Sequence, residues 1–183
     1  MKFAVLGSGM VGQAIAGKLD ELGHDVTIGT RDPDTTRARR EPTPMGMPGF
    51  GTWLEEHQQV RVATFAQAAS DAEIVVLAVS GAIARDVLAS AGAEAVEGKI
   101  VIDITNPLDF SQGMPPTLSI CNTDSVGEQL QQAFPTARIV KTLNTVNADL
   151  MVDPQQLQDG DHTIFVSGND AEAKSVVTGI LTD

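Results

Sequence analysis

Short apolar runs alternate with amphipathic segments along the chain, and this alternation predicts an α/β fold. Most of the runs are continuously apolar, as expected of strands that are buried on both faces of a parallel sheet. The predicted strands cover 2–6, 26–29, 60–63, 73–79, 99–104, 138–143 and 163–168. Apolar residues recur at helical spacing over 11–22, 52–58, 65–71, 82–91, 124–134 and 171–181. The pattern therefore indicates a doubly wound, mostly parallel sheet in a three-layer αβα arrangement.

Two segments lack this periodicity and are predicted to be loops. They are rich in proline and glycine and cover 41–51 and 107–123. Neither has the composition of a linker, and the chain shows no internal repeat. We therefore expect residues 1–183 to form one domain.

A glycine cluster, GSGMVG at residues 7–12, follows the first predicted strand and opens the first predicted helix. This spacing in this position is typical of a turn that binds a dinucleotide pyrophosphate. Gly7 permits the tight turn, Gly9 lets the pyrophosphate approach the backbone, and Gly12 lets the helix pack closely on the strand. The amide groups at the helix start then face the anion. The cluster predicts a Rossmann NAD(P)-binding fold, and a plain glycine-rich turn is the alternative.

The end of the second predicted strand indicates which dinucleotide is expected. NAD-binding domains place an acid about 20 residues after the glycine turn, where it bonds the ribose 2′-hydroxyl. Thr30 and Arg31 stand there instead, and a guanidinium suits a 2′-phosphate that a carboxylate would repel. We therefore expect NADP(H), while Asp32 or Asp34 would serve a ribose if the strand ended later.

Composition argues against several other classes. A net charge of −12 speaks against nucleic acid, because phosphate contacts need clustered lysine and arginine. No apolar run reaches the roughly 20 residues of a membrane span. The single cysteine, Cys121, cannot form an internal disulfide, and a cytoplasmic protein is expected. The stretch DGDH at 159–162 has no second cluster of ligands beside it, so we expect no metal site.

The missing tyrosine, the length of the chain and the residues at positions 30 and 31 narrow the choice among nicotinamide enzymes and other users of a glycine-rich turn. Short-chain dehydrogenases need a catalytic tyrosine, and the chain has none. Hydroxyacid dehydrogenases and related imine reductases need a helical second domain, for which 183 residues leave no room. Methyltransferases favour an acid where Thr30 and Arg31 stand. A sensor or partner module that binds NADP without turnover stays open.

Five segments together resemble the NADPH-dependent F420 reductase family. They are GSGMVG, the TRD after the second strand, VVLAVSG (75–81), DITNP (103–107) and KTLNTVNADLM (141–151). The resemblance covers nearly the whole chain, and the last segment is the most particular to this group. It implies an oxidoreductase that transfers hydride between NADP(H) and the deazaflavin F420, or a flavin-like acceptor such as FMN or FAD. The cytosolic domain of transmembrane metalloreductases is similar.

The resemblance also implies a set of cofactor-binding residues. The glycine turn would line the pyrophosphate, Thr30 and Arg31 would hold the 2′-phosphate, and Arg37 would replace a further basic residue common in the family. The other members lie at strand ends, where ligands bind in an open α/β sheet. The expected set is Gly7, Ser8, Gly9, Met10, Val11, Gly12, Thr30, Arg31, Arg37, Val79, Ser80, Gly81, Asn106, Pro107, Leu143 and Asn144.

The sequence offers no nucleophile–base pair for catalysis. Hydride transfer between two ring cofactors needs stacking and no obligatory protein acid or base. If the acceptor needs a proton, the nearest polar groups are those of Thr142, Asn144, Thr145 and Asn147. Hydrogen bonding within a strand-to-loop corner is the equal alternative for these four residues.

Three further expectations concern the periphery. The segment 41–53, with Met45, Met47 and Trp53, is either a flap over the adenine end or a loop packed on the core. Members of the family continue with a further strand and helices, which are expected to be missing after residue 183. Family analogy also implies a homodimer.

Overall fold

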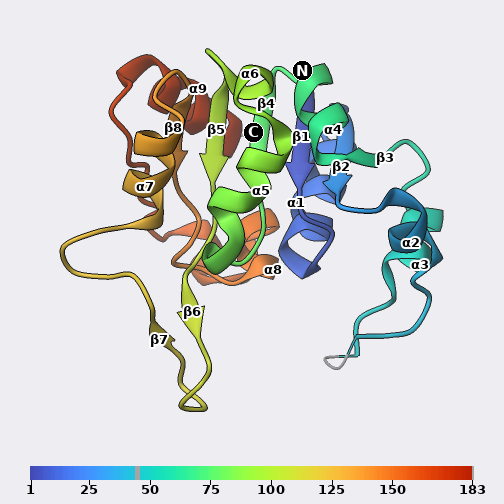
Figure 1. Cartoon of the computed structure of the whole chain (residues 1–183). Coiled ribbons are helices and arrows are strands. Elements are labelled where there is room, and N and C mark those ends of the chain that lie inside the picture. Colours follow the sequence, from blue (N-terminus) through green and yellow to red (C-terminus); the bar gives the residue numbers. More distant parts are fainter. Residues whose placement is uncertain (44–45, 183) are drawn as a thin grey trace.

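The computed structural model describes residues 1–43 and 46–182. Its centre is a six-stranded parallel sheet (Figure 1) in the order β3-β2-β1-β4-β5-β8. This is the strand order of the doubly wound dinucleotide-binding fold, so the predicted fold class is confirmed. The strands are β1 (Lys2–Leu6), β2 (Asp25–Thr30), β3 (Arg61–Thr64), β4 (Ile74–Leu77), β5 (Ile100–Asp103) and β8 (Arg138–Lys141).

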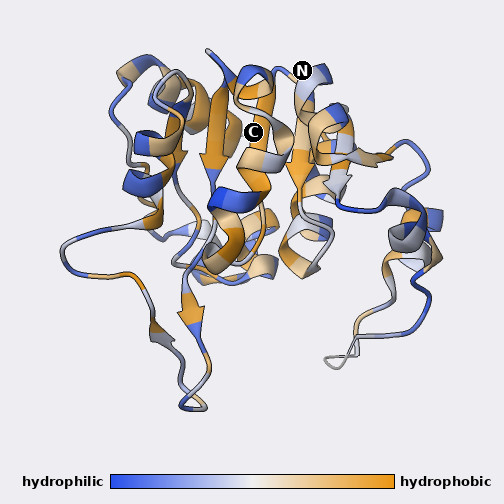
Figure 2. Cartoon of the chain, in the orientation of Figure 1, coloured by the Kyte–Doolittle hydropathy of each residue, from blue (hydrophilic) through white to orange (hydrophobic). Residues whose placement is uncertain are grey.

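Helices cover both faces of the sheet, and each face has its own apolar core. Alternate residues of β1 show the division: Phe3 and Val5 belong to one core, while Ala4 and Leu6 belong to the other. Figure 2 shows the apolar strands enclosed between the two helical layers. The first layer contains α1 (Met10–Glu21), α8 (Ala148–Val152) and α9 (Ala171–Thr182). The second contains α4 (Phe65–Asp71), α5 (Ala84–Ala91), α6 (Ala93–Val96) and α7 (Val126–Ala133).

Two segments extend beyond the carboxyl edge of the sheet (Figure 1). The first lies between α2 (Pro33–Ala38) and α3 (Phe50–Glu56), which pack on each other beside β3. The second is a two-stranded hairpin formed by β6 (Leu108–Asp109) and β7 (Thr117–Leu118). We call residues 107–123 the β6–β7 arm. Short 3₁₀ helices complete the chain: η1 (Gly81–Ile83), η2 (Pro154–Gln156) and η3 (Gln158–Gly160). No helix of the described ranges is long and apolar enough to cross a membrane.

The predicted strand over 163–168 is wrong. Residues of this segment alternate between exposed and half-buried, which mimics a strand, but only one antiparallel bridge forms, between Ser167 and Lys141. The reason lies in β8, which ends at Lys141, and Leu143 then turns the chain away with a φ of 59°. Alternation reports exposure, but it does not report whether a neighbouring strand is long enough to pair.

Some predicted elements are too long, such as β8, which ends at Lys141, and α7, which covers only Val126–Ala133, and most other differences are additions. The helices α2, α6 and α8 were not predicted, and the β6–β7 hairpin lies inside a predicted loop. Helix α3 begins at Phe50, two residues earlier than predicted. Phe50 is buried in the core that also contains α1, and Trp53 packs against this core, so this end of the segment 41–53 packs on the protein body. Trp53 also stacks on His57 with 4.1 Å between ring centroids. Met45 lies outside the described residues.

Candidate cofactor site

Two glycines of the turn between β1 and α1 are required by the fold itself. Gly7 has a φ of +129°, and a Cβ atom there would lie 2.2 Å from the carbonyl oxygen of Ala78. A Cβ atom on Gly12 would lie 2.0 Å from the carbonyl oxygen of Gly7, and real Cβ contacts are essentially never under 3.0 Å. The turn and the close packing of α1 on β1 therefore exclude any side chain at these positions.

Gly9 differs, because nothing in the fold requires it. Its φ of −82° suits any residue, and no atom lies within 4 Å of the position that a Cβ would take. It is the N-cap of α1, yet no side chain caps this helix end. The side-chain amide of Gln13 instead donates to the Ser8 carbonyl oxygen at 3.1 Å and stabilises the turn. The helix N-terminus thus opens on free space, as an anion site requires.

A groove with a volume of about 660 Å³ runs from this turn along the ends of β1, β2 and β4. This volume lies in the range of about 300–1,000 Å³ that is usual for sites of small ligands. Its charged lining residues are Arg31, Arg39, Asp32 and Asp86, and the apolar side chains of Phe65, Val79 and Ile83 also line it. The groove therefore combines cationic groups with an apolar surface, as a phosphorylated adenosine would need.

The two carboxylates that the sequence left as alternative ribose ligands are engaged in α2. Asp32 caps this helix: its Oδ1 accepts from the amides of Asp34 and Thr35, and its Oδ2 accepts from the Thr35 hydroxyl at 2.6 Å. These hydrogen bonds, the one from the Thr35 hydroxyl first, lower the pKa of Asp32 below its usual 3.8. Asp34 forms an ion pair with Arg37 at 3.1 Å.

Thr30 and Arg31, predicted to hold the 2′-phosphate, both line the groove. Thr30 is buried, and its hydroxyl shares a 2.8 Å hydrogen bond with the hydroxyl of Thr36. Arg31 is exposed and takes part in no ion pair within residues 1–43 and 46–182. Its guanidinium is therefore available to an anion, and its role stays a prediction.

Arg37 was expected in the same site, but the structure does not bring it there. Besides its pair with Asp34, it donates to the carbonyl oxygen of Val62 at 2.6 Å, so it is directed toward β3. Arg39 occupies the groove instead: it donates to the Ser8 hydroxyl at 2.6 Å, and its guanidinium carbon lies 5.6 Å from the centre of the Phe50 ring. The sequence did contain a signal for α2, since Asp-Pro is typical of an N-cap followed by proline at the first helical position.

Residues after β4, β5 and β8 contact one another beyond the carboxyl ends of these strands, and their assignment to the nicotinamide stays a prediction. The Gly81 amide donates to the carbonyl oxygen of Asn106 at 2.9 Å, and a Cβ on Gly81 would lie 2.6 Å from that carbonyl carbon. The side chain of Asn106 donates to the Asn144 carbonyl oxygen at 2.6 Å and accepts from the Asn144 amide at 3.4 Å. Leu143 has a φ of 59°, which is rare for a bulky residue, and it turns the chain from the end of β8 toward Asn144.

The four polar residues considered as proton donors have different surroundings. The Thr142 hydroxyl donates to the Phe165 carbonyl oxygen, and the Asn147 side chain caps α8 by accepting from the Leu150 amide. The Asn144 amide is paired with Asn106, whereas Thr145 is exposed. Thr142 and Asn147 therefore form hydrogen bonds within the corner between β8 and α8, whereas the exposed side chain of Thr145 is accessible to a ligand.

The strand order and the glycine turn define a Rossmann-like α/β domain of the dinucleotide-binding class. The chain belongs to the family described as NADP oxidoreductase, coenzyme F420-dependent, whose model matches residues 2–107. These findings confirm the family that the five sequence segments resemble.

Individual relatives agree with this family. The crystal structure of a candidate F420-dependent NADP reductase from Arthrobacter sp. FB24 is 58% identical with a TM-score of 0.94, and the match covers 100% of this chain and 80% of that chain. The F420-dependent NADP reductase of Methanothermobacter marburgensis is 29% identical, over 84% of this chain and 67% of the relative. Metalloreductase STEAP3 of Rattus norvegicus is 27% identical, over 97% of this chain and 31% of the relative. The chain spans 31% to 49% of the length of the first three curated relatives that it matches.

Proposed function

We propose that the chain is an NADP(H)-dependent oxidoreductase that transfers hydride between NADP(H) and a deazaflavin of the F420 type, or a flavin-like acceptor. The observation that carries this proposal is Gly9, because the fold leaves the space above it empty and does not itself need a glycine there. A pyrophosphate that contacts the backbone would explain both facts. The coenzyme named in the family's description supports F420 as the first acceptor to test.

Arg31 and Arg39 would bind the phosphates of the adenosine half. The Arg39 guanidinium already contacts Ser8 of the glycine turn, so it can reach the pyrophosphate, while Arg31 lies beyond the end of β2, where a 2′-phosphate is expected. Two carboxylates, Asp32 and Asp86, also line the groove, so the phosphates would be bound by direct contact with the two guanidiniums and not by a net positive charge of the groove. Phe65, Val79 and Ile83 provide an apolar surface for the adenine.

The nicotinamide half would lie over the loops that follow β4, β5 and β8. When bound, NADPH supplies the hydride, and the protein contributes orientation and exclusion of water. The mutual hydrogen bonds of Asn106 and Asn144 hold two of these loops together, so the surface against the ring is fixed before the ring arrives. Thr145 is the exposed polar group nearest in sequence to this surface if the acceptor takes up a proton.

The alternative is an NADP-binding sensor or partner module without turnover. The paired amides of Asn106 and Asn144 are compatible with it, because they supply geometry and no reactive group. Both functions predict tighter binding of NADPH than of NADH, so equal affinity or a preference for NADH would contradict the assignment of Arg31. Stopped-flow oxidation of bound NADPH with F420, FMN and FAD as acceptors separates the two, since only the oxidoreductase passes on a hydride.

We also propose that two copies of the chain associate through the β6–β7 arm. Its side chains Phe110 and Met114 are 55% and 80% exposed, and an isolated two-stranded hairpin is only marginally stable in water. The arm has one charged residue, Asp109, in a chain of which 20% of the residues are charged. Two copies that each bear a net charge of −12 would repel each other least across this surface, which carries a single charge.

A further inference from the structure

We propose that Asp103 and Lys141 form a positioning pair that fixes the turn 104–107 and, through it, the plane of the nicotinamide. The proposal rests on the proposed function and extends it, because neither residue belongs to the set expected to touch the cofactor. Asp103 is the last residue of β5, Lys141 is the last residue of β8, and the two are partners in the register of these strands. Side chains of registered residues leave the sheet on the same face, here toward α7.

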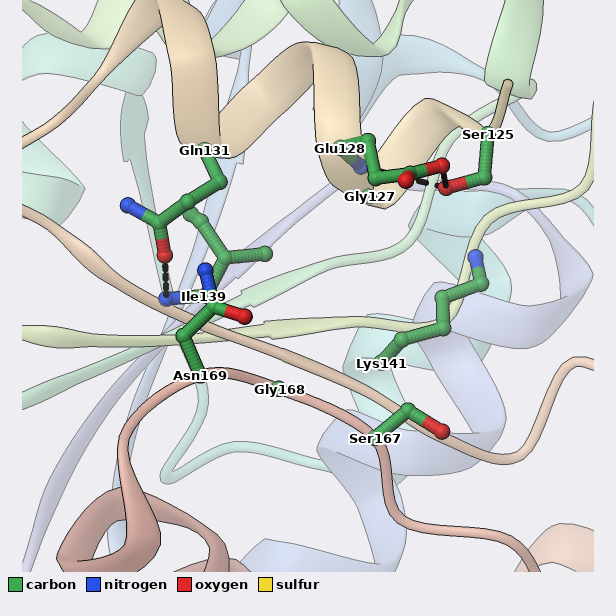
Figure 3. Close-up of a pocket in the computed structure, with 9 residues that line it drawn as sticks. All are labelled: Ser125, Gly127, Glu128, Gln131, Ile139, Lys141, Ser167, Gly168 and Asn169. Carbon is green, nitrogen blue, oxygen red and sulfur yellow. Dashed lines mark hydrogen bonds between the residues drawn. The ribbon is translucent and has the colours of Figure 1, made fainter. Parts of the chain in front are cut away.

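The two side chains form an ion pair inside the protein. Lys141 Nζ lies 3.1 Å from Asp103 Oδ1, and the Asp103 side chain is fully buried. The Lys141 side chain is 23% exposed, and it borders a cavity of about 420 Å³ between α7 and residues 167–169 (Figure 3). The pair therefore lies under the first turn of α7, at the carboxyl end of the sheet where the cofactor is expected.

The pair holds both backbone groups of Thr105. The Thr105 amide donates to Asp103 Oδ1 at 2.9 Å, and the Lys141 ammonium donates to the Thr105 carbonyl oxygen. Thr105 is itself buried, so its peptide groups have no bulk water as an alternative partner. Removing the ammonium would leave this carbonyl free to rotate.

Thr105 leads directly to Asn106, which joins the three loops of the nicotinamide end. The carbonyl of Asn106 accepts from the Gly81 amide, and its side chain is paired with Asn144. A displacement of Thr105 is thus transmitted to the loops after β4 and β8 through hydrogen bonds that are already made.

Stability alone does not account for this pair. Asp103 Oδ2 is buried without a hydrogen-bond partner in the described part of the chain. Burial lowers the pKa of Lys141, and the attraction of Asp103 opposes this effect without cancelling it. Burial of the charged ammonium is therefore unfavourable in itself. Apolar replacements of buried ion pairs are often neutral or stabilising. The contacts of the pair with the amide and the carbonyl of Thr105 therefore point to a use in the geometry of this turn.

The test compares the double variant D103N/K141M with wild type. The double change removes both charges together and leaves no lone buried ion, so the variant is expected to fold. We expect NADPH to bind with an unchanged Kd, to within about threefold, because the adenosine half keeps its contacts. Hydride transfer should slow by about 100-fold, the loss typical of a misplacement of about 1 Å.

Two readouts do not depend on turnover. Hydrogen exchange of the Gly81 amide should accelerate by about tenfold, because its acceptor on Asn106 becomes mobile. The circular dichroism band of bound NADPH should also change, because it reports the orientation of the nicotinamide. K99M is the matched control: Lys99 Nζ donates to the carbonyls of Ala69 and Ser70 at the opposite end of the sheet, and its loss should leave all three readouts unchanged.

Unchanged exchange at Gly81 together with an unchanged dichroism band in D103N/K141M would overturn the proposal. It would also fail if K99M slowed hydride transfer as much as the double variant does, since the effect would then be general destabilisation. If wild type binds NADPH but passes hydride to no acceptor, the proposed function fails, and the exchange and dichroism measurements still decide the role of the pair.

Discussion

The two glycines Gly9 and Gly12 stand three residues apart in one motif, yet the structure assigns them different tasks that one pair of variants can separate. A Cβ atom on Gly12 would collide with the Gly7 carbonyl oxygen, whereas a Cβ atom on Gly9 would have no atom within 4 Å. We therefore expect Gly12→Ser to reduce stability and Gly9→Ser to reduce binding of NADPH.

The magnitudes follow from the contacts. In Gly12→Ser the new Cβ must move by about 1 Å to bring its 2.0 Å contact to the 3.0 Å limit, and overpacking of this kind costs about 1–3 kcal/mol. For a chain of this size that is a fall in Tm of roughly 2–12 °C. Gly9→Ser adds a preferred N-cap residue to α1, so its stability should be unchanged or higher by a few tenths of a kcal/mol, roughly 1 °C in Tm.

Binding should show the reverse order. A side chain at position 9 fills the space where the pyrophosphate would contact the backbone, and a clash of about 1–3 kcal/mol lowers NADPH affinity by about 5- to 150-fold. Thermal unfolding followed by circular dichroism gives the first quantity, and titration of NADPH fluorescence gives the second. Gly9→Ser with unchanged affinity, or with a Tm as low as that of Gly12→Ser, would refute the assignment of Gly9 to a ligand.

Three further predictions use other parts of the molecule. Arg31→Ala should weaken the binding of NADPH by about 10- to 150-fold and leave that of NADH unchanged, since hydrogen bonds to charged groups contribute about 1.5–3 kcal/mol. The control Arg37→Ala changes a side chain that is directed toward β3 and does not line the groove, so it should change neither titration. The pKa of Asp32 is lowered in the folded protein, so its carboxylate stabilises the fold above the unfolded-state pKa near 3.8 and loses this effect as the pH falls through the folded-state pKa. In urea unfolding, the excess stability of wild type over Asp32→Asn should therefore disappear at acid pH. A stability difference that is constant with pH would contradict the capping role of the Asp32 carboxylate. Light scattering should find dimers that Phe110→Asp dissociates and that Phe165→Asp, at a phenylalanine outside the arm that is even more exposed (67% against 55%), leaves intact. A wild type that stays monomeric would exclude the arm as an interface.

The sequence predicted best where one property determines the structure. Continuously apolar runs such as EIVVLAV at 73–79 identify strands buried on both faces, and β1, β4 and β5 lie inside the predicted ranges. The glycine spacing predicted the turn before α1, because this turn has a recognisable local pattern; the contact of Gly7 with the Ala78 carbonyl oxygen, which comes from the end of β4, became visible only in the structure. The segment 163–168 failed for the opposite reason: pairing depends on where β8 ends, and β8 is a different part of the chain.

The arginines of the site show the same limit. Counting along the sequence favoured Arg37, but α2 begins at Pro33 under the cap of Asp32 and directs position 37 toward β3. Arg39 reaches the groove only because the chain leaves the helix after Ala38 and passes the Phe50 ring. Nothing in the run of basic residues distinguishes Arg39 from Arg40, which pairs with Glu55 instead.

Trp53 on α3 is an intrinsic fluorescent probe of the cofactor groove. Trp53 is the one tryptophan of the chain, and its indole is flanked by Phe50, the ring over which Arg39 lies. Ultraviolet excitation therefore samples a single position, and its emission overlaps the absorption of a reduced nicotinamide. Energy transfer from Trp53 would report occupancy of the groove in real time, without any label.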